Sequence, residues 1–349
     1  MSDYRFEFCT EETVERLIEF IDVYWQKNHI LVQSRELFDW QHKAGNGEYN
    51  FALAISNKTN EICGIQGFIP SGHFSKDLEN NNETWLAIWK VRDDIKAPGL
   101  GAAILKFIRK RYKTVCALGL NKLVLPFYAT FKYQVGVLNH HVLINNERQN
   151  FSILQPGIWK KIELYHPITE YGLVEQTIET ISKLNIRSEK NVFFTKPLKD
   201  VNFLINRYLR HPIYDYKVYA IFKDDLISGF LVTRHVSLKN STIIRVIDYQ
   251  GSFDHLSKLY NPLIKILKKY DAEYIDFMQF GIPVTFLQKA GFIDVYKYQD
   301  MVVPDYFEPF VNTNIVIDFA YKTKNAEPNF FICKGDGDQD RPSSFGVIS

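Results

Sequence analysis

The sequence has few residues of the kinds that build disulfides, metal centres or membrane spans. Its 349 residues include four cysteines, which are far apart and form no CxxC pair: Cys9, Cys63, Cys116 and Cys333. With no histidine beside them at metal-ligand spacing, they indicate buried, reduced thiols rather than a zinc site. No apolar run approaches the roughly 18 residues of a membrane-spanning helix, and the amino terminus lacks the layout of a signal peptide. We therefore expect a cytoplasmic protein with no metal and no membrane association.

The chain also lacks an excess of either charge. Its 42 Lys and Arg balance 40 Asp and Glu to a formal net charge of +2. Nucleic acids and anionic membranes select strongly basic surfaces, so neither is an expected partner. Aromatic residues, in contrast, are plentiful, with 27 Phe, 20 Tyr and 5 Trp. Most of them must form the core, which at this length suffices for two domains, and a surplus could line a cleft that stacks a base or a sugar.

Hydrophobic periodicity divides the first half of the chain into strands and amphipathic helices. The predicted strands are 4–8, 51–55, 62–69, 85–91, 123–125 and 137–144, and the predicted helices are 14–25, 102–112 and 127–135. Three antiparallel strands precede the helix at 102–112, and a βα crossover follows. A doubly wound sheet would alternate strands and helices throughout, so this order excludes that fold.

The second half shows the same order again. The predicted helices are 200–209, 256–267 and 284–290, and the predicted strands are 217–222, 226–236, 242–249 and 274–278. Two local matches support a duplication: Ile-Cys-Gly at 62–64 resembles Ile-Ser-Gly at 227–229, and Gly136 and Gly291 each follow a short helix. Two unrelated α+β domains are the alternative.

The duplication predicts the domain boundaries. Residues 1–147 form the first domain and residues 191–349 the second. The pattern loosens over 148–190, where Pro-Gly and His-Pro pairs interrupt it, although a helix is expected at 173–184. We interpret 148–190 as a connecting region.

A strand, a glycine-containing turn and a helix follow one another in the first half. The alternating run 85–91 ends at polar residues, and Gly99 and Gly101 precede the helix at 102–112. The unpaired N–H groups at such a helix start, together with the helix dipole, suit a phosphate, and glycine has no Cβ to hold the phosphate away. A turn of this kind also occurs for steric reasons alone.

The turn resembles the signature of the GNAT superfamily of acyl-CoA N-acyltransferases. The family has Gln/Arg-x-x-Gly-x-Gly/Ala between its fourth strand and third helix, and this chain has Lys96-Ala97-Pro98-Gly99-Leu100-Gly101, with lysine in place of the planar side chain. Residues 286–292 resemble the family's closing segment, with Leu287 in place of tyrosine. The resemblance implies an α/β fold of the α+β type: two GNAT-like domains in tandem, each a mixed, mostly antiparallel sheet flanked by helices.

The resemblance also assigns roles to the two domains. The first would hold acyl-CoA as cosubstrate, and the second, which has no glycine pair after its strand, would be degenerate and contribute to the acceptor site. In the first domain Lys132 stands where the family has its acid tyrosine, so Tyr128 and Tyr133 are the candidates for that role.

Several phrases spread over the chain narrow the resemblance. They are 29–42, 67–70, 85–91, 207–212 and 335–342. They resemble tandem GNAT-type enzymes of bacterial surface-polysaccharide (lipopolysaccharide and O-antigen) pathways that N-acylate nucleotide-linked amino sugars. The likeness suggests a dTDP-3-amino-3,6-dideoxyhexose N-acyltransferase that uses acetyl-CoA or a hydroxyacyl-CoA such as 3-hydroxybutanoyl-CoA. Such enzymes are often homodimers, which the sequence leaves open.

The resemblance implies the residues that contact acyl-CoA, and residue chemistry and position suggest the other candidates. The acyl-CoA would contact Trp89, Lys90, Val91, Lys96, Ala97, Pro98, Gly99, Leu100, Gly101 and Ala102. The substrate-binding candidates are His29, Trp40, Phe68 and Asp338. The candidate general bases are His141, Asp248 and His42, with His29 as a further histidine. A histidine can accept a proton from an amine near neutral pH, although each of these could equally be structural.

Two acidic candidates have alternatives of their own. Asp248 ends a second-half strand and could simply pair with Arg245 or cap the next helix. Asp338 lies in an aspartate-rich stretch that resembles the start of a calcium loop, but Arg341 occupies its sixth position, where an EF-hand needs glycine. The stretch is therefore either solvated or a site for sugar hydroxyls or an ammonium group.

Two other functions are compatible with the resemblance. One is an aminoacyl or peptidyl transferase with tandem GNAT domains that takes its donor from tRNA, which the balanced charge disfavours. The other is a non-catalytic CoA-binding protein that retains the fold.

Overall fold

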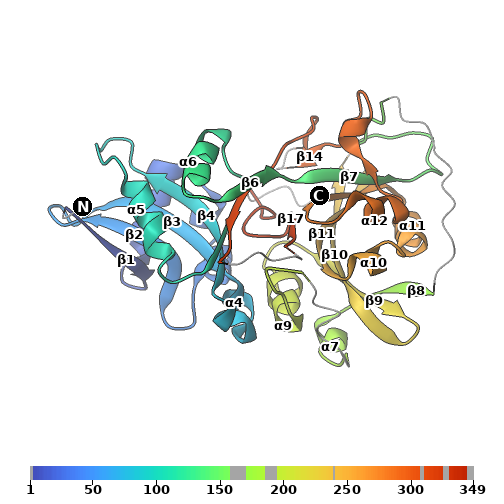
Figure 1. Ribbon diagram of the computed structural model, residues 1–349, viewed down its shortest axis with the longest axis horizontal. Helices are drawn as coiled ribbons and strands as arrows, with labels where there is room; N and C mark the ends of the chain where they lie inside the picture. Colours follow the sequence, from blue (N-terminus) through green and yellow to red (C-terminus); the bar gives the residue numbers. More distant parts are fainter. Residues whose placement is uncertain are drawn as a thin grey trace. The chain divides into compact units, whose positions relative to one another are not determined.

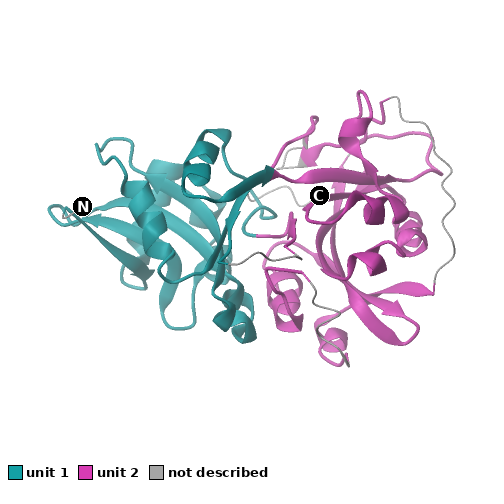
Figure 2. Ribbon diagram, viewed as in Figure 1, with its two compact units in different colours: residues 1–136, 318–326, 337–346 teal, residues 137–317, 327–336, 347–349 magenta. Residues whose placement is uncertain are grey.

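The computed structural model describes residues 3–157, 170–184, 195–238, 240–306, 310–324 and 330–343. The chain forms two compact units (Figure 2). Unit 1 comprises residues 1–136, 318–326 and 337–346, and unit 2 comprises 137–317, 327–336 and 347–349. Each unit has its own sheet with helices, so the predicted α/β architecture of two mixed sheets is confirmed. Both units also contain segments from the carboxy-terminal part of the chain.

The sheet of unit 1 has the strand order β1-β2-β3-β4-β5-β16-β6. The strands are β1 (Tyr4–Thr10), β2 (Glu48–Ser56), β3 (Ile62–Pro70), β4 (Glu83–Val91), β5 (Thr114–Leu118), β6 (Gln134–Val137) and β16 (Asp318–Lys322). β4 and β5 are parallel, whereas β1–β2, β2–β3, β3–β4 and β5–β16 are antiparallel. The sheet is therefore mixed and mostly antiparallel, as expected.

Helices cover both faces of this sheet (Figure 1). They are α1 (Val14–Phe20), the π-helix η1 (Ile21–Trp25), α2 (Ile30–Gln33), α3 (Arg35–His42), α4 (Ser71–Phe74), η2 (Lys76–Asn81), α5 (Leu100–Ile108), η3 (Lys122–Val124) and α6 (Leu125–Thr130). Neighbouring residues of a strand point to opposite faces. Phe51 of β2 accordingly stacks on Phe38 of α3, while Ala52 packs in the cluster that α5 covers.

The sequence pattern explains the helices that matter for the site. Leu100, Ile104, Leu105 and Ile108 recur at helical spacing on α5, and all four are buried against β2–β5. The Oγ of Ser34 caps α3 by accepting a hydrogen bond from the Leu37 amide at 3.1 Å.

One strand prediction in unit 1 is wrong, and one strand was not predicted. The predicted strand 123–125 is a helical segment, and the strand that pairs with β4 is β5, which the sequence analysis missed. Leu123 is 86% exposed and Pro126 opens α6, so this apolar triplet was not a buried strand. The predicted strand 137–144 is confirmed as β7 (Asn139–Ile144), which belongs to the second sheet, and only its first residue lies in β6 of the first sheet.

The sheet of unit 2 has the order β13-β7-β12-β11-β10-β9-β8, with β17 paired to β12. Its strands are β7 (Asn139–Ile144), β8 (Tyr171–Gln176), β9 (Tyr216–Lys223), β10 (Leu226–Leu238), β11 (Ser241–Gly251), β12 (Ala272–Phe280), β13 (Ile293–Asp294) and β17 (Ile332–Cys333). The hairpin β14 (Asp305–Tyr306) and β15 (Phe310–Val311) stands apart. The helices are α7 (Ile178–Ile181), α9 (Val201–Leu204), η4 (Ile205–Leu209), α10 (Phe253–Leu256), α11 (Tyr260–Lys269), α12 (Val284–Lys289) and η5 (Val295–Lys297).

The predicted helix at 173–184 is also wrong. Residues 171–176 form β8, which pairs antiparallel with β9, and Thr177 caps the short helix α7. The polar residues among the apolar ones misled the helical interpretation, because an edge strand alternates in a similar way over so short a stretch. Among the described residues, no helix is both long enough and apolar enough to span a membrane.

Candidate functional site

In unit 1, strands β4 and β5 run together and then part. They pair from Glu83 with Thr114 to Leu86 with Ala117, and the pairing stops there although β4 continues to Val91. On its other side β4 stays paired with β3, but with one extra residue between the pairs Leu86–Phe68 and Trp89–Gln66. This β-bulge turns the backbone. Within the described chain, no strand pairs with the β5 side of β4 over residues 87–91.

The side chain of Gln66 stabilises this bulge. Its Nε2 donates to the carbonyl oxygens of Ala87 at 3.1 Å and Ile88 at 3.4 Å, and the residue is buried. The bulge leaves these backbone carbonyls without partners in the sheet, and a buried side-chain amide can donate hydrogen bonds to them. An aliphatic side chain could not. Gln66 was not among the predicted site residues. The one feature of the sequence that pointed to it is that it is a polar residue inside the apolar run 62–69.

The turn after β4 leads directly to the start of α5. Gly99 has φ +81° and is the residue before the helix, and the first helical bond joins the Ala103 amide to the Gly99 carbonyl at 3.0 Å. The amides of Gly101 and Ala102 precede that bond. No acidic residue stands in the first turn, and Lys96 and Pro98 are exposed. An exposed helix start with these amides and a nearby lysine is a favourable place for an anion.

Glycine is required at the two positions of the turn for different reasons. At Gly99 an added Cβ would meet nothing within 4 Å, so the left-handed conformation is what requires glycine. At Gly101 an added Cβ would lie 2.7 Å from the Trp89 indole. The second glycine therefore makes room for Trp89, and the expectation that its missing Cβ admits a phosphate is corrected.

Trp89 belongs to an aromatic cluster between β4, α5 and α6. Its ring centroid lies 5.1 Å from Phe127 and 6.2 Å from Tyr128, and Tyr128 lies 5.1 Å from Tyr133. The Trp89 Nε1 and the Tyr133 hydroxyl are buried and have no partner among the described residues. Burial raises the pKa of Tyr128 and of Tyr133 well above 10, so both stay protonated at neutral pH.

The predicted site residues divide between the units. The turn, the residues 89–91, His29, Trp40, His42, Phe68 and Asp338 lie in unit 1, and His141 and Asp248 lie in unit 2. The three candidate bases are thus not gathered in one unit.

His42 and His29 are buried on the α1–α3 side of unit 1. His42 Nδ1 and His29 Nε2 have no partner among the described residues, while His29 Nδ1 accepts a hydrogen bond from the Leu31 amide at 3.3 Å. Burial, helped by the charge of Arg341, lowers the pKa of His29 to about 3. Burial also lowers the pKa of His42 well below 6.5, aided by His73. Both imidazoles are therefore neutral at pH 7.

The other substrate-binding candidates of unit 1 lie in different surroundings. The Trp40 ring lies 5.2 Å from that of Phe74 in a tilted arrangement, and the Trp40 carbonyl accepts a hydrogen bond from His73 Nε2 at 2.8 Å. Phe68 is fully buried in the core, 5.6 Å from Phe8. Asp338 is partly exposed and forms an ion pair with Arg341 at 3.3 Å.

The two candidate bases in unit 2 are buried. His141 lies on β7 opposite Phe277, and burial lowers its pKa to about 4. Asp248 is completely buried, and its carboxylate accepts from Lys199 Nζ at 2.7 Å and from the Tyr208 hydroxyl at 2.6 Å. The expected pairing of Asp248 with Arg245 is not found, because Arg245 instead pairs with Asp276 and Asp305.

The described residues contain no group of three or more His, Cys, Asp or Glu side chains that could hold a metal ion. The four cysteines are free and buried, as expected, and Cys333 lies beside Lys199 at 3.8 Å.

Comparison with known proteins identifies the fold. No family model and no curated protein matches the sequence. Among solved structures, a GCN5-related N-acetyltransferase from Anabaena variabilis ATCC 29413 superimposes with a TM-score of 0.52 at 10% identity, over 92% of this chain and 73% of that one. A conserved protein of unknown function from Enterococcus faecalis V583, whose description proposes an N-acyltransferase, gives 0.54 at 6% identity, over 92% and 72%.

A yeast N-myristoyltransferase with bound myristoyl-CoA, from Saccharomyces cerevisiae, gives a TM-score of 0.47 at 11% identity, over 94% of this chain and 82% of that one. At identities of 10% and 6%, the superpositions with TM-scores of 0.52 and 0.54 establish the fold alone. The chain shares the α/β fold of these two structures, with a mixed sheet and helices in each unit, as the sequence resemblance implied.

Proposed function

We propose that this chain transfers an acyl group from coenzyme A to an amine, with the acyl-CoA bound in unit 1. The observation that supports the proposal best is the unpaired side of β4 beyond Leu86, followed directly by the start of α5. A pantetheine arm has two amide groups that can bond to a strand edge, and a pyrophosphate suits the amides at a helix start. The β4 edge and the turn 96–102 offer both within about fifteen residues of chain.

The transfer needs no enzyme-bound intermediate. The amine nitrogen attacks the thioester carbonyl carbon, the carbon–sulfur bond breaks, and the thiolate takes up a proton. Backbone amides of residues 87–91 would stabilise the oxyanion, because pre-aligned donors act most strongly where charge develops. Tyr128 is our candidate for the proton donor to the thiolate, because its raised pKa keeps the hydroxyl protonated.

His42 is the general base that we favour among the three candidates. It lies in the same unit as the turn, and burial keeps its imidazole neutral at pH 7. A neutral imidazole can accept the proton that the attacking amine loses. His141 stays a proposal, and so does Asp248, although Lys199 and Tyr208 already bind its carboxylate.

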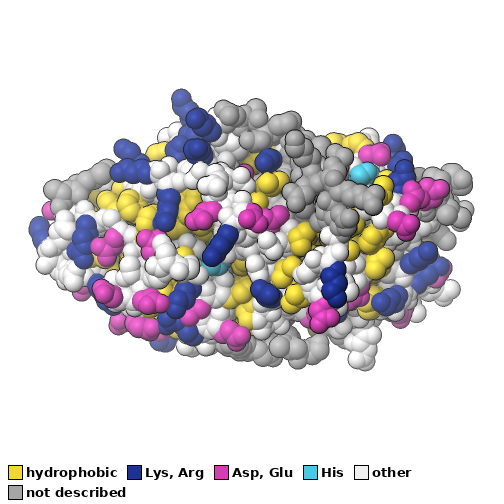
Figure 3. Space-filling model, turned by 90° about the horizontal axis from the view of Figure 1, so that it is seen from below, with side chains coloured by type: hydrophobic (Ala, Val, Ile, Leu, Met, Phe, Trp, Pro, Cys, Tyr) yellow, Lys and Arg dark blue, Asp and Glu magenta, His cyan; other side chains and the backbone are white. Residues whose placement is uncertain are grey.

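We further propose a nucleotide-linked amino sugar, such as a dTDP-3-amino-3,6-dideoxyhexose, as the acceptor. Support comes from the sequence segments that resemble such enzymes, and from His29 Nε2 in unit 1, a buried atom without a partner among the described residues that a ligand hydroxyl would satisfy. Asp338 stays a proposed contact, although Arg341 already pairs with its carboxylate. Lys and Arg side chains lie among Asp and Glu side chains on the face that Figure 3 draws. The net charge of +2 for the whole chain disfavours the tRNA-dependent alternative.

A thiol-release assay tests this proposal. The protein is incubated with acetyl-CoA or 3-hydroxybutanoyl-CoA and a panel of dTDP- and UDP-linked amino sugars, and free CoA thiol is followed. We expect turnover with at least one amino sugar and none with the matching hydroxy sugars. No turnover with any amine would contradict the proposal, and calorimetric CoA binding without turnover would support the non-catalytic alternative.

A further inference from the structure

Unit 2 repeats the parting strands of unit 1. Its parallel strands β11 and β12 pair from Thr242 with Ala272 to Val246 with Phe277. β11 then continues to Gly251 without β12, and it has an extra residue, Ile247, in its pairing with β10. The bulge and the divergence lie at the same place in the strand order as those of β4 and β5. Both units therefore have an opening where two parallel strands part, which we name the slot. In unit 1 it is the place that we propose for acyl-CoA.

The slot of unit 2 is filled by the chain itself. Strand β17 pairs antiparallel with β12, Cys333 opposite Gln279 and Ile332 opposite Phe280. Two residues on, the Gly335 amide donates to the carbonyl of Ile247 on β11 at 2.9 Å. One segment thus bonds to both strands that part, and Figure 1 shows β17 beside β11. We name residues 331–336 the plug. They occupy the place in unit 2 that corresponds to the β4 edge of unit 1, which has no strand partner among the described residues.

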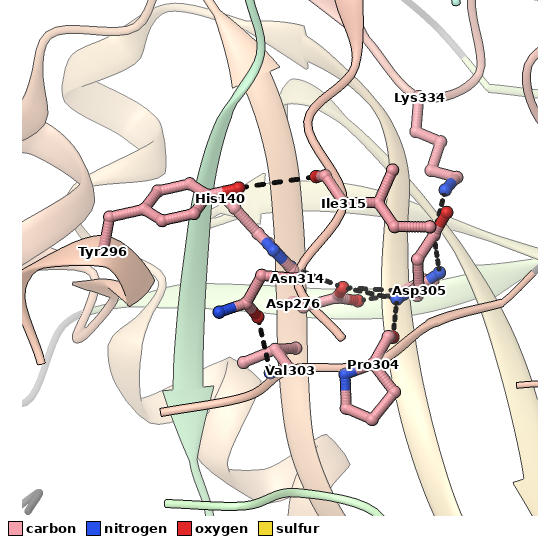
Figure 4. A network of polar contacts seen from close by, with 10 residues as sticks. His140, Asp276, Tyr296, Val303, Pro304, Asp305, Asn314, Ile315 and Lys334 are labelled. Carbon is pink, nitrogen blue, oxygen red and sulfur yellow. Dashed lines mark hydrogen bonds and ion pairs between the residues drawn. The ribbon is translucent and has the colours of Figure 1, made fainter. Parts of the chain in front are cut away.

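Buried ion pairs hold one side of the plug (Figure 4). Lys334 Nζ lies 2.6 Å from Asp305 Oδ1, and Asp305 also binds Arg245 at 3.1 Å. Arg245 continues to Asp276 at 3.0 Å, which binds His140 Nε2 at 2.9 Å. All five side chains are nearly inaccessible. Withdrawing Lys334 would leave Asp305 with one cation fewer in the interior, which is costly.

A second buried group holds the other side. Asp336 Oδ1 lies 2.9 Å from Lys199 Nζ, which also binds Asp248. Asp336 Oδ2 accepts the amide of Cys333 at 2.9 Å and so closes the turn of the plug on itself. The buried charges therefore fix the plug from two directions.

We propose that the plug permanently occupies the slot in unit 2, and that the chain therefore binds acyl-CoA in unit 1 only. The restriction of acyl-CoA to unit 1 rests on the proposed function. An extended peptide and a pantetheine arm present the same chemistry to a strand edge, namely amide N–H and carbonyl groups. Both cannot occupy the slot together. The helix that follows β11 is α10, and its start has no glycine pair. The Oγ of Ser252 caps it by accepting a hydrogen bond from the His255 amide at 3.3 Å.

Substitution at Gly335 tests the plug without any ligand. A Cβ there would lie 2.5 Å from the Tyr208 hydroxyl and 2.8 Å from the Ile247 carbonyl, whereas at Gly172 of the same unit it would meet nothing within 4 Å. In hydrogen–deuterium exchange of the full chain, we expect the amides of 331–336 to exchange as slowly as those of β11. Gly335→Ala should speed their exchange at least tenfold, and the control Gly172→Ala should not. Immediate exchange of 331–336 in the unsubstituted protein would overturn the plug, whatever CoA does.

Stoichiometry tests the consequence. Calorimetric titration with acetyl-CoA should give one equivalent per chain, and saturating acetyl-CoA should leave the exchange of 331–336 unchanged. Two equivalents, or a change in exchange at 331–336 on binding, would overturn the proposal that the slot is closed. Absence of all binding, together with slow exchange of 331–336, would contradict the proposed function and leave the plug supported.

Discussion

Single side chains explain why the turn after β4 has its sequence. Gly101 has no Cβ because the Trp89 indole lies there, and Gln66 is polar because the bulge leaves the Ala87 and Ile88 carbonyls to be satisfied. The spacing of the glycines was readable from the sequence, because it matches a known signature. The roles of Trp89 and Gln66 were not, because both depend on a bulge that alternation alone cannot locate.

The buried histidine His29 predicts a pH dependence of stability. Folding lowers its pKa from 6.5 to about 3 by burial, so its contribution is present above pH 6.5 and is lost as the pH falls toward the folded value. Between pH 6.5 and 5 this amounts to about 2 kcal/mol. His29→Asn keeps an acceptor for the Leu31 amide and removes the titration. We expect urea unfolding to show a smaller stability loss over this range in His29→Asn than in the unsubstituted protein, and equal losses would refute this.

Tyr128 gives a test at the same scale for catalysis. If its hydroxyl protonates the leaving thiolate, Tyr128→Phe should lower kcat about 100-fold and leave the KM for acyl-CoA within about twofold. Its raised pKa predicts no alkaline loss of activity from this group between pH 7 and 9. Tyr112→Phe, at a partly buried tyrosine beside Phe68, is the control and should keep its kcat. Equal effects of the two substitutions would assign Tyr128 to packing.

At the scale of elements, the order of strands and helices around the site was largely readable. The hairpin β2–β3, strand β4 and helix α5 have strong periodicity and clear turn residues, and they form as predicted. The failures at 123–125 and 173–184 concern short stretches, where apolar residues fit a strand and a helix equally well. Tertiary pairing with β9 decided the second case.

The start of α5 predicts how acyl-CoA binding responds to charge. Gly99→Asp places a carboxylate beside the proposed pyrophosphate, and repulsion at about 5 Å in a partly solvated site costs about 3 kcal/mol, or roughly 100-fold in Kd. Gly47 is a close control, because it has φ +80° in the same unit and also faces open space. Calorimetry should show weak or no acetyl-CoA binding by Gly99→Asp and unchanged affinity for Gly47→Asp. Unchanged affinity in both would make the turn merely structural.

At the scale of the whole molecule, the sequence indicated two similar halves but not how the chain returns. Residues 318–322 supply strand β16 to unit 1, residues 332–333 supply β17 to unit 2, and 337–346 belong to unit 1 again. No local pattern encodes such exchanges, because they depend on which strand edges remain open after both sheets have formed. The aspartates near the end of the chain had looked like a motif for a ligand. Asp336 instead belongs to a buried ion pair with Lys199, and Asp338 to a pair with Arg341.

The most direct test of the central claim is the exchange of backbone amides in unit 1 with and without acetyl-CoA. Hydrogen–deuterium exchange would be followed over residues 87–91 and 99–102 at saturating ligand, with binding verified by calorimetry. If acyl-CoA binds along the β4 edge and at the start of α5, the amides of these two segments become protected and those of β8 in unit 2 do not. Bound acetyl-CoA that leaves both segments unprotected would contradict this assignment of the site.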